Sequence, residues 1–227
     1  MKYRFLLFDA DNTILDFDSA ENQALQFAFQ NANLHFDNNV LAVYKRNNIA
    51  CWEALERGEM SRDEVLVRRF ELTFEQLGLD ADIGAIADDY ERELHNGYFV
   101  VPHAHEVLST LHSLGYKLYL VSNGVLSIQT SRMQGADMNK YFIKKFISEE
   151  IGFPKPKLEF FTKSFAQIQD FDPSSALIIG DSLTGDILGG NNAKIATCWF
   201  NPHHRSNNIG AIVDHEIYDL RDLLNIV

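Results

Sequence analysis

The feature that most constrains the fold of this chain is a series of short apolar runs, each of which stops abruptly at polar residues. A buried strand that ends at a loop produces this pattern. The runs are YRFLLF (3–8), KLYLVSNG (117–124), SALIIGDS (175–182) and ATCWFNP (196–202), with a weaker one in FIKKFISEEIG (142–152). Helical patterns at 105–114 and 158–169 alternate with them. We therefore expect an α/β fold with a parallel sheet covered on both faces, and a working site beyond the carboxyl ends of its strands.

Residues 17–98 interrupt this alternation and are helical throughout. Helical patterns cover 19–32, 40–57, 61–77 and 83–96. Ser61 and Glu64 fit a capping box, and Gly58 and Gly78 suit helix ends. These patterns predict an all-helical domain at 17–98, inserted into a core domain made of 1–16 and 99–227. A closing amphipathic helix is expected at 219–227.

Composition narrows the classes of partner. Twenty Lys and Arg face 32 Asp and Glu, a net charge of −12 without any basic run, so an electrostatic grip on nucleic acid is not expected. No stretch approaches the roughly 18 apolar residues of a membrane span, so no membrane partner is expected. Cys51 and Cys198 lie far apart without a CxxC motif, which favours a reducing, cytoplasmic location. The oligomeric state, monomer or dimer, stays open.

Asp9 and Asp11 follow the first apolar run in the pattern D-x-D-x-T, which Thr13 completes. Two carboxylates about 4 Å apart repel by roughly 4 kcal/mol at an effective dielectric of about 20, so one is pushed towards holding a proton. Such a pair suits a carboxylate nucleophile beside a general acid and base. A turn with two solvated aspartates is the other interpretation of the motif.

Three further motifs favour the chemical interpretation. Ser122 and Asn123 end the second clear run and offer a hydroxyl and backbone N–H groups to phosphate oxygens. Lys155 precedes Pro156, whose fixed φ can aim an ammonium group. Asp181 and Asp186 follow the IIG run. Clustered carboxylates with few basic neighbours need a cation, and hard oxygen ligands select Mg²⁺.

Together, in this order and over nearly the whole chain, these motifs resemble those of the haloacid dehalogenase superfamily. The resemblance implies a doubly wound, Rossmann-like sheet, a helical cap of type I, and an aspartyl-enzyme intermediate. It implies that Asp9 is the nucleophile, and that Asp11 protonates the leaving group and then activates water. It also implies a set of metal ligands and a set of phosphate-binding groups. These are Asp9, the Asp11 carbonyl and Asp181 for Mg²⁺, with Asp186 close by or acting through water, and Thr13, Ser122, Asn123 and Lys155 for the phosphoryl group.

The charges of this site suggest that Asp11 carries a proton. Four carboxylates, one lysine and Mg²⁺ leave one negative charge, which a substrate dianion would have to meet. A proton on Asp11 brings the total to zero, and the metal and lysine can then neutralise charge during transfer.

Four segments are similar in sequence to the pyrimidine 5′-nucleotidase subgroup of that superfamily. They are FDADNTILDFDSAE, WEALERGEMSRDEVLVRRF, SEEIGFPKPKLEFF and IIGDSLTGDILGG. The resemblance implies a Mg²⁺-dependent phosphomonoesterase whose small-molecule substrate is a nucleoside monophosphate. Phe17, just after the first motif, could meet the base, and Trp52 could border it. Packing is the commoner role of a phenylalanine or a tryptophan.

Other activities stay open. A phosphatase of a sugar phosphate or another small phosphometabolite, and a sugar phosphomutase, would use the same motifs. Asp11 counts against a dehalogenase, which resembles a site without the second aspartate. A phospho-accepting receiver module also clusters aspartates on a parallel sheet, but it needs no helical insertion of about eighty residues. A lid that excludes water suits an enzyme.

Overall fold

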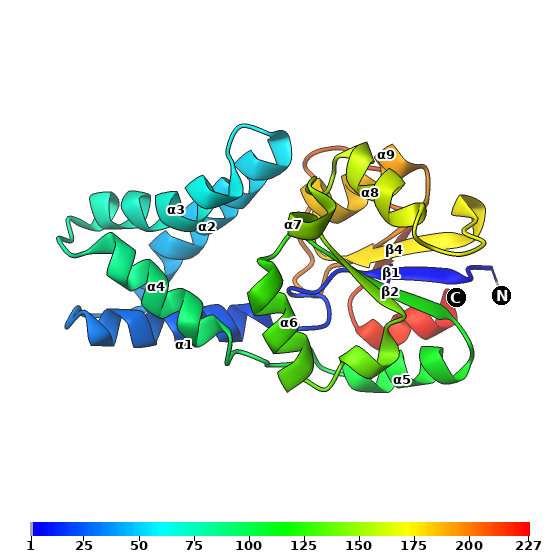
Figure 1. Cartoon of the computed structure of the whole chain (residues 1–227), viewed down its shortest axis with the longest axis horizontal. Coiled ribbons are helices and arrows are strands. Elements are labelled where there is room, and N and C mark those ends of the chain that lie inside the picture. Colours follow the sequence, from blue (N-terminus) through cyan, green and yellow to red (C-terminus); the bar gives the residue numbers. More distant parts are fainter. Residues whose placement is uncertain (1) are drawn as a thin grey trace. The chain divides into compact units, whose positions relative to one another are not determined.

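The computed structural model describes residues 2–227, which form two compact units (Figure 1). Of the described residues, one unit combines 2–16 with Tyr98–Val227, and the other is Phe17–Gly97. Tyr98 lies in the first unit, one residue earlier than the sequence pattern placed the boundary.

The first unit is built on a six-stranded sheet in which every neighbouring pair is parallel. The strands lie in the order β3-β2-β1-β4-β5-β6. Their bounds are β1 Phe5–Phe8, β2 Lys117–Ser122, β3 Lys144–Ile147, β4 Ala176–Gly180, β5 Ala196–Phe200 and β6 His215–Ile217. The predicted doubly wound parallel sheet is confirmed. The sequence pattern missed β6, because three residues at a sheet edge are too short to show a period.

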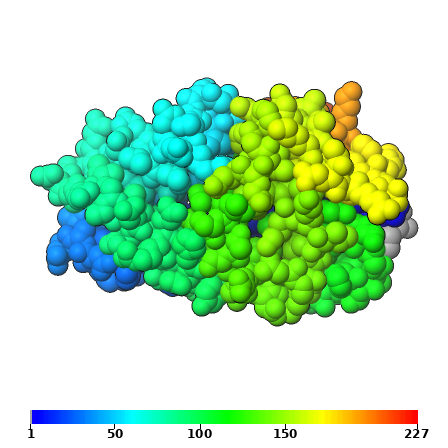
Figure 2. Space-filling model, in the orientation of Figure 1, coloured from blue at the N-terminus to red at the C-terminus, as the bar shows by residue number. Residues whose placement is uncertain are grey.

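Successive side chains of β1 point to opposite faces of the sheet and enter two separate cores. Leu6 and Phe8 pack with residues of α5 (Ala104–Ser113), whereas Phe5 and Leu7 pack with residues of α8 (Leu158–Phe165). In Figure 1, α5 covers one face of the sheet, and α8 with α9 (Leu188–Ala193) covers the other. β1 is almost hidden in the space-filling view (Figure 2). Burial on both faces explains its unbroken apolar run.

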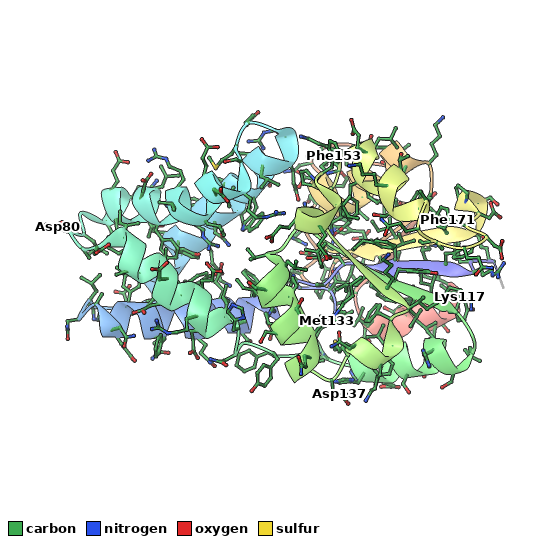
Figure 3. All side chains as sticks on the ribbon, in the orientation of Figure 1. Asp80, Lys117, Met133, Asp137, Phe153 and Phe171 are labelled. Atoms are coloured by element: carbon green, nitrogen blue, oxygen red, sulfur yellow. The ribbon has the colours of Figure 1, made fainter. Side chains whose placement is uncertain are left out.

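The strand order reverses at β1, and this reversal places the site. The chain adds β2 and β3 on one side of β1 and then crosses to β4 on the other. Phe8 is therefore in register with both Leu120 and Ile179. In open α/β sheets the crevice beyond the carboxyl ends of the strands at such a reversal is where ligands bind. Lys117, labelled in Figure 3, begins β2 and marks the opposite end of the sheet.

The second unit consists of four helices. They are α1 Phe17–Asn31, α2 Asn38–Arg57, α3 Arg62–Leu77 and α4 Ile83–Leu94. The capping box of Ser61 and Glu64 forms as predicted, and Gly58 and Gly78 end α2 and α3 at φ of +79° and +63°. All four helices were expected from the sequence, with ends that differ by up to two residues. Their placement as a cap over the substrate stays a prediction.

Other elements depart from the sequence prediction. Helices α6 (Leu126–Gly135) and α7 (Ser148–Ile151) were not expected, and α8 ends at Phe165 instead of residue 169. Phe171, labelled in Figure 3, stacks on Phe165 with ring centroids 4.0 Å apart, in the loop that follows α8. The expected closing helix is a 3-10 helix at Leu220–Asn225. Within residues 2–227, no helix is both long enough and apolar enough to span a membrane.

Candidate active site

Three neighbouring strands deliver polar groups to the same edge of the sheet. Asp9 directly follows β1, and its N–H donates to the Ile179 carbonyl of β4 at 2.8 Å. Ser122 is the last residue of β2, and Asp181 directly follows β4. The alignment of parallel strands therefore gathers residues that lie more than a hundred positions apart in the sequence.

Lys155 lies at the centre of this group. Its Nζ donates to Asp9 Oδ1 at 2.6 Å, to Asp186 Oδ1 at 2.6 Å and to the Val121 carbonyl at 2.9 Å. Burial alone would lower the pKa of Lys155, but the carboxylates of Asp186 and Asp9 outweigh it and raise the pKa above its usual range. The ammonium group is therefore held charged between the two carboxylates.

Asp9, Asp181 and Asp186 form a cluster that fits a divalent cation. One carboxylate oxygen from each lies within 4.8 Å of the others. Burial raises the pKa of all three groups, and that of Asp181 reaches about 7 because the charge of Asp9 adds to the effect. A bound cation removes this penalty, and all three donors are the hard oxygens that Mg²⁺ prefers. The identity of the ion stays open in this geometry.

Gly180 makes room for this cluster. A Cβ at that position would lie 2.1 Å from Oδ2 of Asp186. The same Oδ2 accepts the Ser182 N–H at 3.1 Å, which fixes the carboxylate at the start of the loop. Any side chain at residue 180 would therefore displace Asp186 from Lys155.

Asp181 has a cationic neighbour that the sequence motifs did not reveal. Arg205 Nη2 donates to Asp181 Oδ2 at 3.1 Å and to the Asp181 carbonyl at 2.7 Å. Asn201 holds the backbone of Arg205 through both its N–H and its carbonyl. The Arg205 side chain is half exposed, so its ion pair with Asp181 is open to water.

Asp11 also has partners that the motifs did not reveal. Arg132 Nη1 forms a hydrogen-bonded ion pair with Asp11 Oδ1, and Gln129 Nε2 donates to Asp11 Oδ2 at 2.6 Å. Both residues come from α6, the helix that the sequence analysis missed. With that helix recognised, their spacing of three residues would have signalled a shared face.

The predicted phosphate-binding residues occupy different positions around Asp9. Thr13 is buried, and its Oγ1 donates to Asp9 Oδ2 at 3.3 Å. Ser122 Oγ accepts from the Gly124 N–H at 3.0 Å and from Gln129 Nε2 at 2.9 Å. Asn123 uses its side chain on the backbone of Lys155. Their roles towards a phosphoryl group stay predictions.

Phe17 and Trp52 belong to the helical unit. Phe17 is the first residue of α1, and Trp52 lies on α2, packed against the apolar cluster of Cys51, Leu55 and Val65. The unit that carries the aspartates contains neither residue. Contact of either ring with a base therefore stays a prediction.

The chain belongs to the haloacid dehalogenase-like hydrolases, since the model of that family matches residues 3–194. It is therefore a hydrolase, and the predicted family is confirmed. The carboxylate cluster and its lysine lie at the positions where the family motifs were recognised in the sequence.

Curated relatives match over the whole chain. YfnB from Bacillus subtilis is 40% identical over 226 residues, which cover all of this chain and 96% of the relative. The pyrimidine 5′-nucleotidase PynA from Streptococcus pneumoniae is 39% identical, covering 99% of this chain and 95% of the relative. The pyrimidine 5′-nucleotidase YjjG from Escherichia coli is 30% identical, with 98% and 97% covered. The predicted resemblance to the pyrimidine 5′-nucleotidase subgroup is confirmed.

Solved structures agree on the fold. A magnesium-bound crystal structure of YfnB from Bacillus subtilis has a TM-score of 0.94 at 40% identity, covering 100% of this chain and 99% of the other. L-2-haloacid dehalogenase from Xanthobacter autotrophicus has a TM-score of 0.77 at 16% identity, with 99% and 98% covered. At that identity the likeness concerns the fold alone.

Proposed function

We propose that this chain is a Mg²⁺-dependent 5′-nucleotidase that hydrolyses pyrimidine nucleoside monophosphates through an aspartyl-phosphate intermediate. The coarser assignment is a phosphoric monoester hydrolase, which rests on the family and on relatives that are named nucleotidases or phosphatases. The proposal adds the aspartyl-phosphate mechanism, Mg²⁺ as the metal and a pyrimidine as the nucleobase of the substrate.

The observation that carries the proposal is the pairing of Asp9 with Lys155 beside two further carboxylates. Lys155 Nζ donates to Asp9 Oδ1, and one carboxylate oxygen from each of Asp9, Asp181 and Asp186 lies within 4.8 Å of the other two. A carboxylate at this place can attack a phosphorus atom, because the buried ammonium group stabilises the charge of the transferring phosphoryl group.

The proposed reaction has two displacements. An oxygen of Asp9 attacks phosphorus and the bond to the nucleoside 5′ oxygen breaks, while Asp11 gives that oxygen a proton. Water then attacks the aspartyl phosphate, Asp11 takes a proton from it, and inorganic phosphate and the Asp9 carboxylate are released. General acid and base help of this kind contributes typically about 10² to 10⁴ in rate.

Asp9, Asp181 and Asp186 are proposed to hold Mg²⁺, with the Asp11 carbonyl. When bound, the ion supplies positive charge for the phosphoryl oxygens. The crystal structure of the relative YfnB is a complex with magnesium, which supports this choice of ion.

The pyrimidine base is the finer part of the proposal. Its support is the identity of 39% and 30% with PynA and YjjG over nearly complete chains. A second candidate is a small sugar phosphate, since the glyceraldehyde 3-phosphate phosphatase from Pyrococcus abyssi is 29% identical over 72% of this chain. The longer match to the nucleotidases favours the nucleotide.

Phosphate release from matched panels tests the proposal. We expect kcat/KM with Mg²⁺ to be highest for uridine and thymidine 5′-monophosphates, lower for purine 5′-monophosphates and lowest for hexose phosphates. Asp9→Asn should abolish turnover of all of them while the thermal melt stays near that of the wild type. If kcat/KM for hexose phosphates exceeds that for the nucleotides by tenfold or more, the nucleotidase assignment is wrong and only the phosphatase assignment remains. Activity of Asp9→Asn near the wild-type level would exclude the aspartyl phosphate.

A further inference from the structure

Asp11 is held at both of its carboxylate oxygens by side chains from one face of α6. Arg132 Nη1 pairs with Oδ1, and Gln129 Nε2 donates to Oδ2 at 2.6 Å. Rotation of the carboxylate would break one of the two contacts. The arrangement therefore fixes the plane of the Asp11 carboxylate, although the Asp11 side chain is more exposed than those of Gln129 and Arg132.

Gln129 is itself fixed on several sides. Its Oε1 accepts from Arg132 Nη1 at 3.3 Å, and its Nε2 also donates to Ser122 Oγ at 2.9 Å. Gly124 gives it room, because a Cβ at that position would lie 2.6 Å from Nε2. The amide thus ties the loop after β1 to the end of β2.

The burial of Gln129 and Arg132 indicates that their polar groups serve the Asp11 carboxylate. Arg132 is 0% exposed and Gln129 is 2% exposed. Taking a guanidinium group out of water is unfavourable unless a well-oriented anion pairs with it. Met133, the next residue and labelled in Figure 3, is equally buried and anchors α6 on the apolar core. The rigid helix therefore delivers both donors to Asp11.

We infer that Gln129 and Arg132 are positioning residues that hold Asp11 as an oriented base for hydrolysis of the aspartyl phosphate. This inference rests on the proposed function. In that step a water oxygen bonds to phosphorus, the bond from phosphorus to Asp9 breaks, and Asp11 accepts the proton from water. One N–H donor on each oxygen holds the carboxylate in a single orientation, and correct orientation is a large part of such assistance.

An aryl ester separates this step from the first one. The p-nitrophenolate group leaves without a proton from Asp11, so formation of the aspartyl phosphate from p-nitrophenyl phosphate should not depend on the positioning pair. Rapid mixing with excess ester then reports two rates. The initial burst of p-nitrophenolate measures formation of the aspartyl phosphate, and the steady rate measures its hydrolysis.

The variants are Gln129→Met and Arg132→Met, with Gln134→Met on the exposed face of α6 as the matched control. Both positioning variants should keep a burst rate within about threefold of the wild type and lose about tenfold or more in the steady rate. Arg132→Lys, which keeps the charge, should recover part of the loss. The burst amplitude measures the concentration of folded active sites. The steady rate is therefore divided by this amplitude, so that poor folding of a variant lowers the amplitude and leaves the two compared rates unchanged.

A fall of both rates by one common factor, or no fall in the steady rate, would overturn the positioning role while leaving the proposed function intact. Agreement of the two variants would locate the effect at Asp11, which both Gln129 and Arg132 contact. Failure of the wild type to release p-nitrophenolate above the level of Asp9→Asn would instead remove the proposed function, and the positioning role with it.

Discussion

The side chain of Asn123 pairs with the backbone of Lys155 in both directions. Asn123 Oδ1 accepts the Lys155 N–H at 2.8 Å, and Asn123 Nδ2 donates to the Lys155 carbonyl at 3.0 Å. The residue was predicted to bind phosphate, and that role stays a prediction. The side chain, however, fixes the residue from which the buried ammonium group extends.

Asn123→Ala should therefore act through Lys155. Misplacing a catalytic group by about 1 Å can cost on the order of 10² in rate, so we expect kcat/KM to fall about tenfold to a hundredfold. A double-mutant cycle is the measurement: in a Lys155→Ala background the same substitution should cost less than about twofold. Equal losses in both backgrounds would show that Asn123 acts independently of Lys155.

Lys155 and Lys157 offer a matched pair of substitutions. Lys155 is buried between Asp9 and Asp186, whereas Lys157 is exposed at the start of α8. Lys155→Ala should lower kcat by about 10² or more, since it removes the cation that faces the transferring charge. Lys157→Ala should stay within about twofold of the wild type. Steady-state kinetics with one nucleotide decides, and similar losses would mean that the motif has been aligned on the wrong lysine.

The sequence predicted the sheet and the aspartates for a physical reason. A strand buried on both faces must be apolar throughout, so β1, β2, β4 and β5 and the polar residues at their ends are visible as sharp changes in polarity. Because parallel strands end at one edge, residues as distant as Asp9 and Asp181 could be placed together. The helices of the second unit were visible as helical patterns, supported by the capping box of Ser61 and Glu64 and by Gly58 and Gly78 at helix ends.

The partners of the aspartates could not be predicted in the same way. Arg132 and Arg205 carry no local signal, since one lies on an unrecognised helix and the other in the loop after β5. The expectation that Asp11 needs a proton for neutrality included Mg²⁺ and a single cationic side chain, that of Lys155. With both arginines included, four carboxylates face three cations, and a divalent ion makes the site positive by one charge. Neutrality alone therefore does not require a proton on Asp11.

Removal of the divalent ion should affect both activity and stability. A strong chelator should abolish turnover and Mg²⁺ should restore it, because within residues 2–227 the three crowded carboxylates form ion pairs with Lys155 and Arg205 alone. Mg²⁺ at about a hundred times its Kd should add about 2.7 kcal/mol to the free energy of unfolding. Thermal melts with and without Mg²⁺ measure this, and Asp181→Asn should lose most of the effect. Full activity in chelator would remove the metal from the mechanism.

Glu21 in the helical unit gives a pH-dependent prediction that is separate from the aspartate cluster. It is 2% exposed, its Oε1 accepts from Asn48 Nδ2 at 2.8 Å, and Lys45 Nζ lies 3.9 Å from Oε2. Burial raises the pKa of Glu21 to about 7, against the opposing effect of Lys45. Between about pH 4.5 and pH 7, Glu21 therefore holds a proton in the folded chain but has lost it in the unfolded chain.

The sign follows from that difference in bound protons. Stability that depends on protonated Glu21 is fully present at about pH 4.5 and is lost as the pH rises to 7, so Glu21→Gln should stabilise the chain most at high pH. We expect a gain of about 2 to 3 kcal/mol at pH 8 and almost none at pH 4.5. Urea unfolding at both values measures it, with Glu75→Gln on the exposed side of α3 as the control for loss of one charge. A gain that is equal at the two pH values would mean that Glu21 keeps its charge in the folded chain throughout this range.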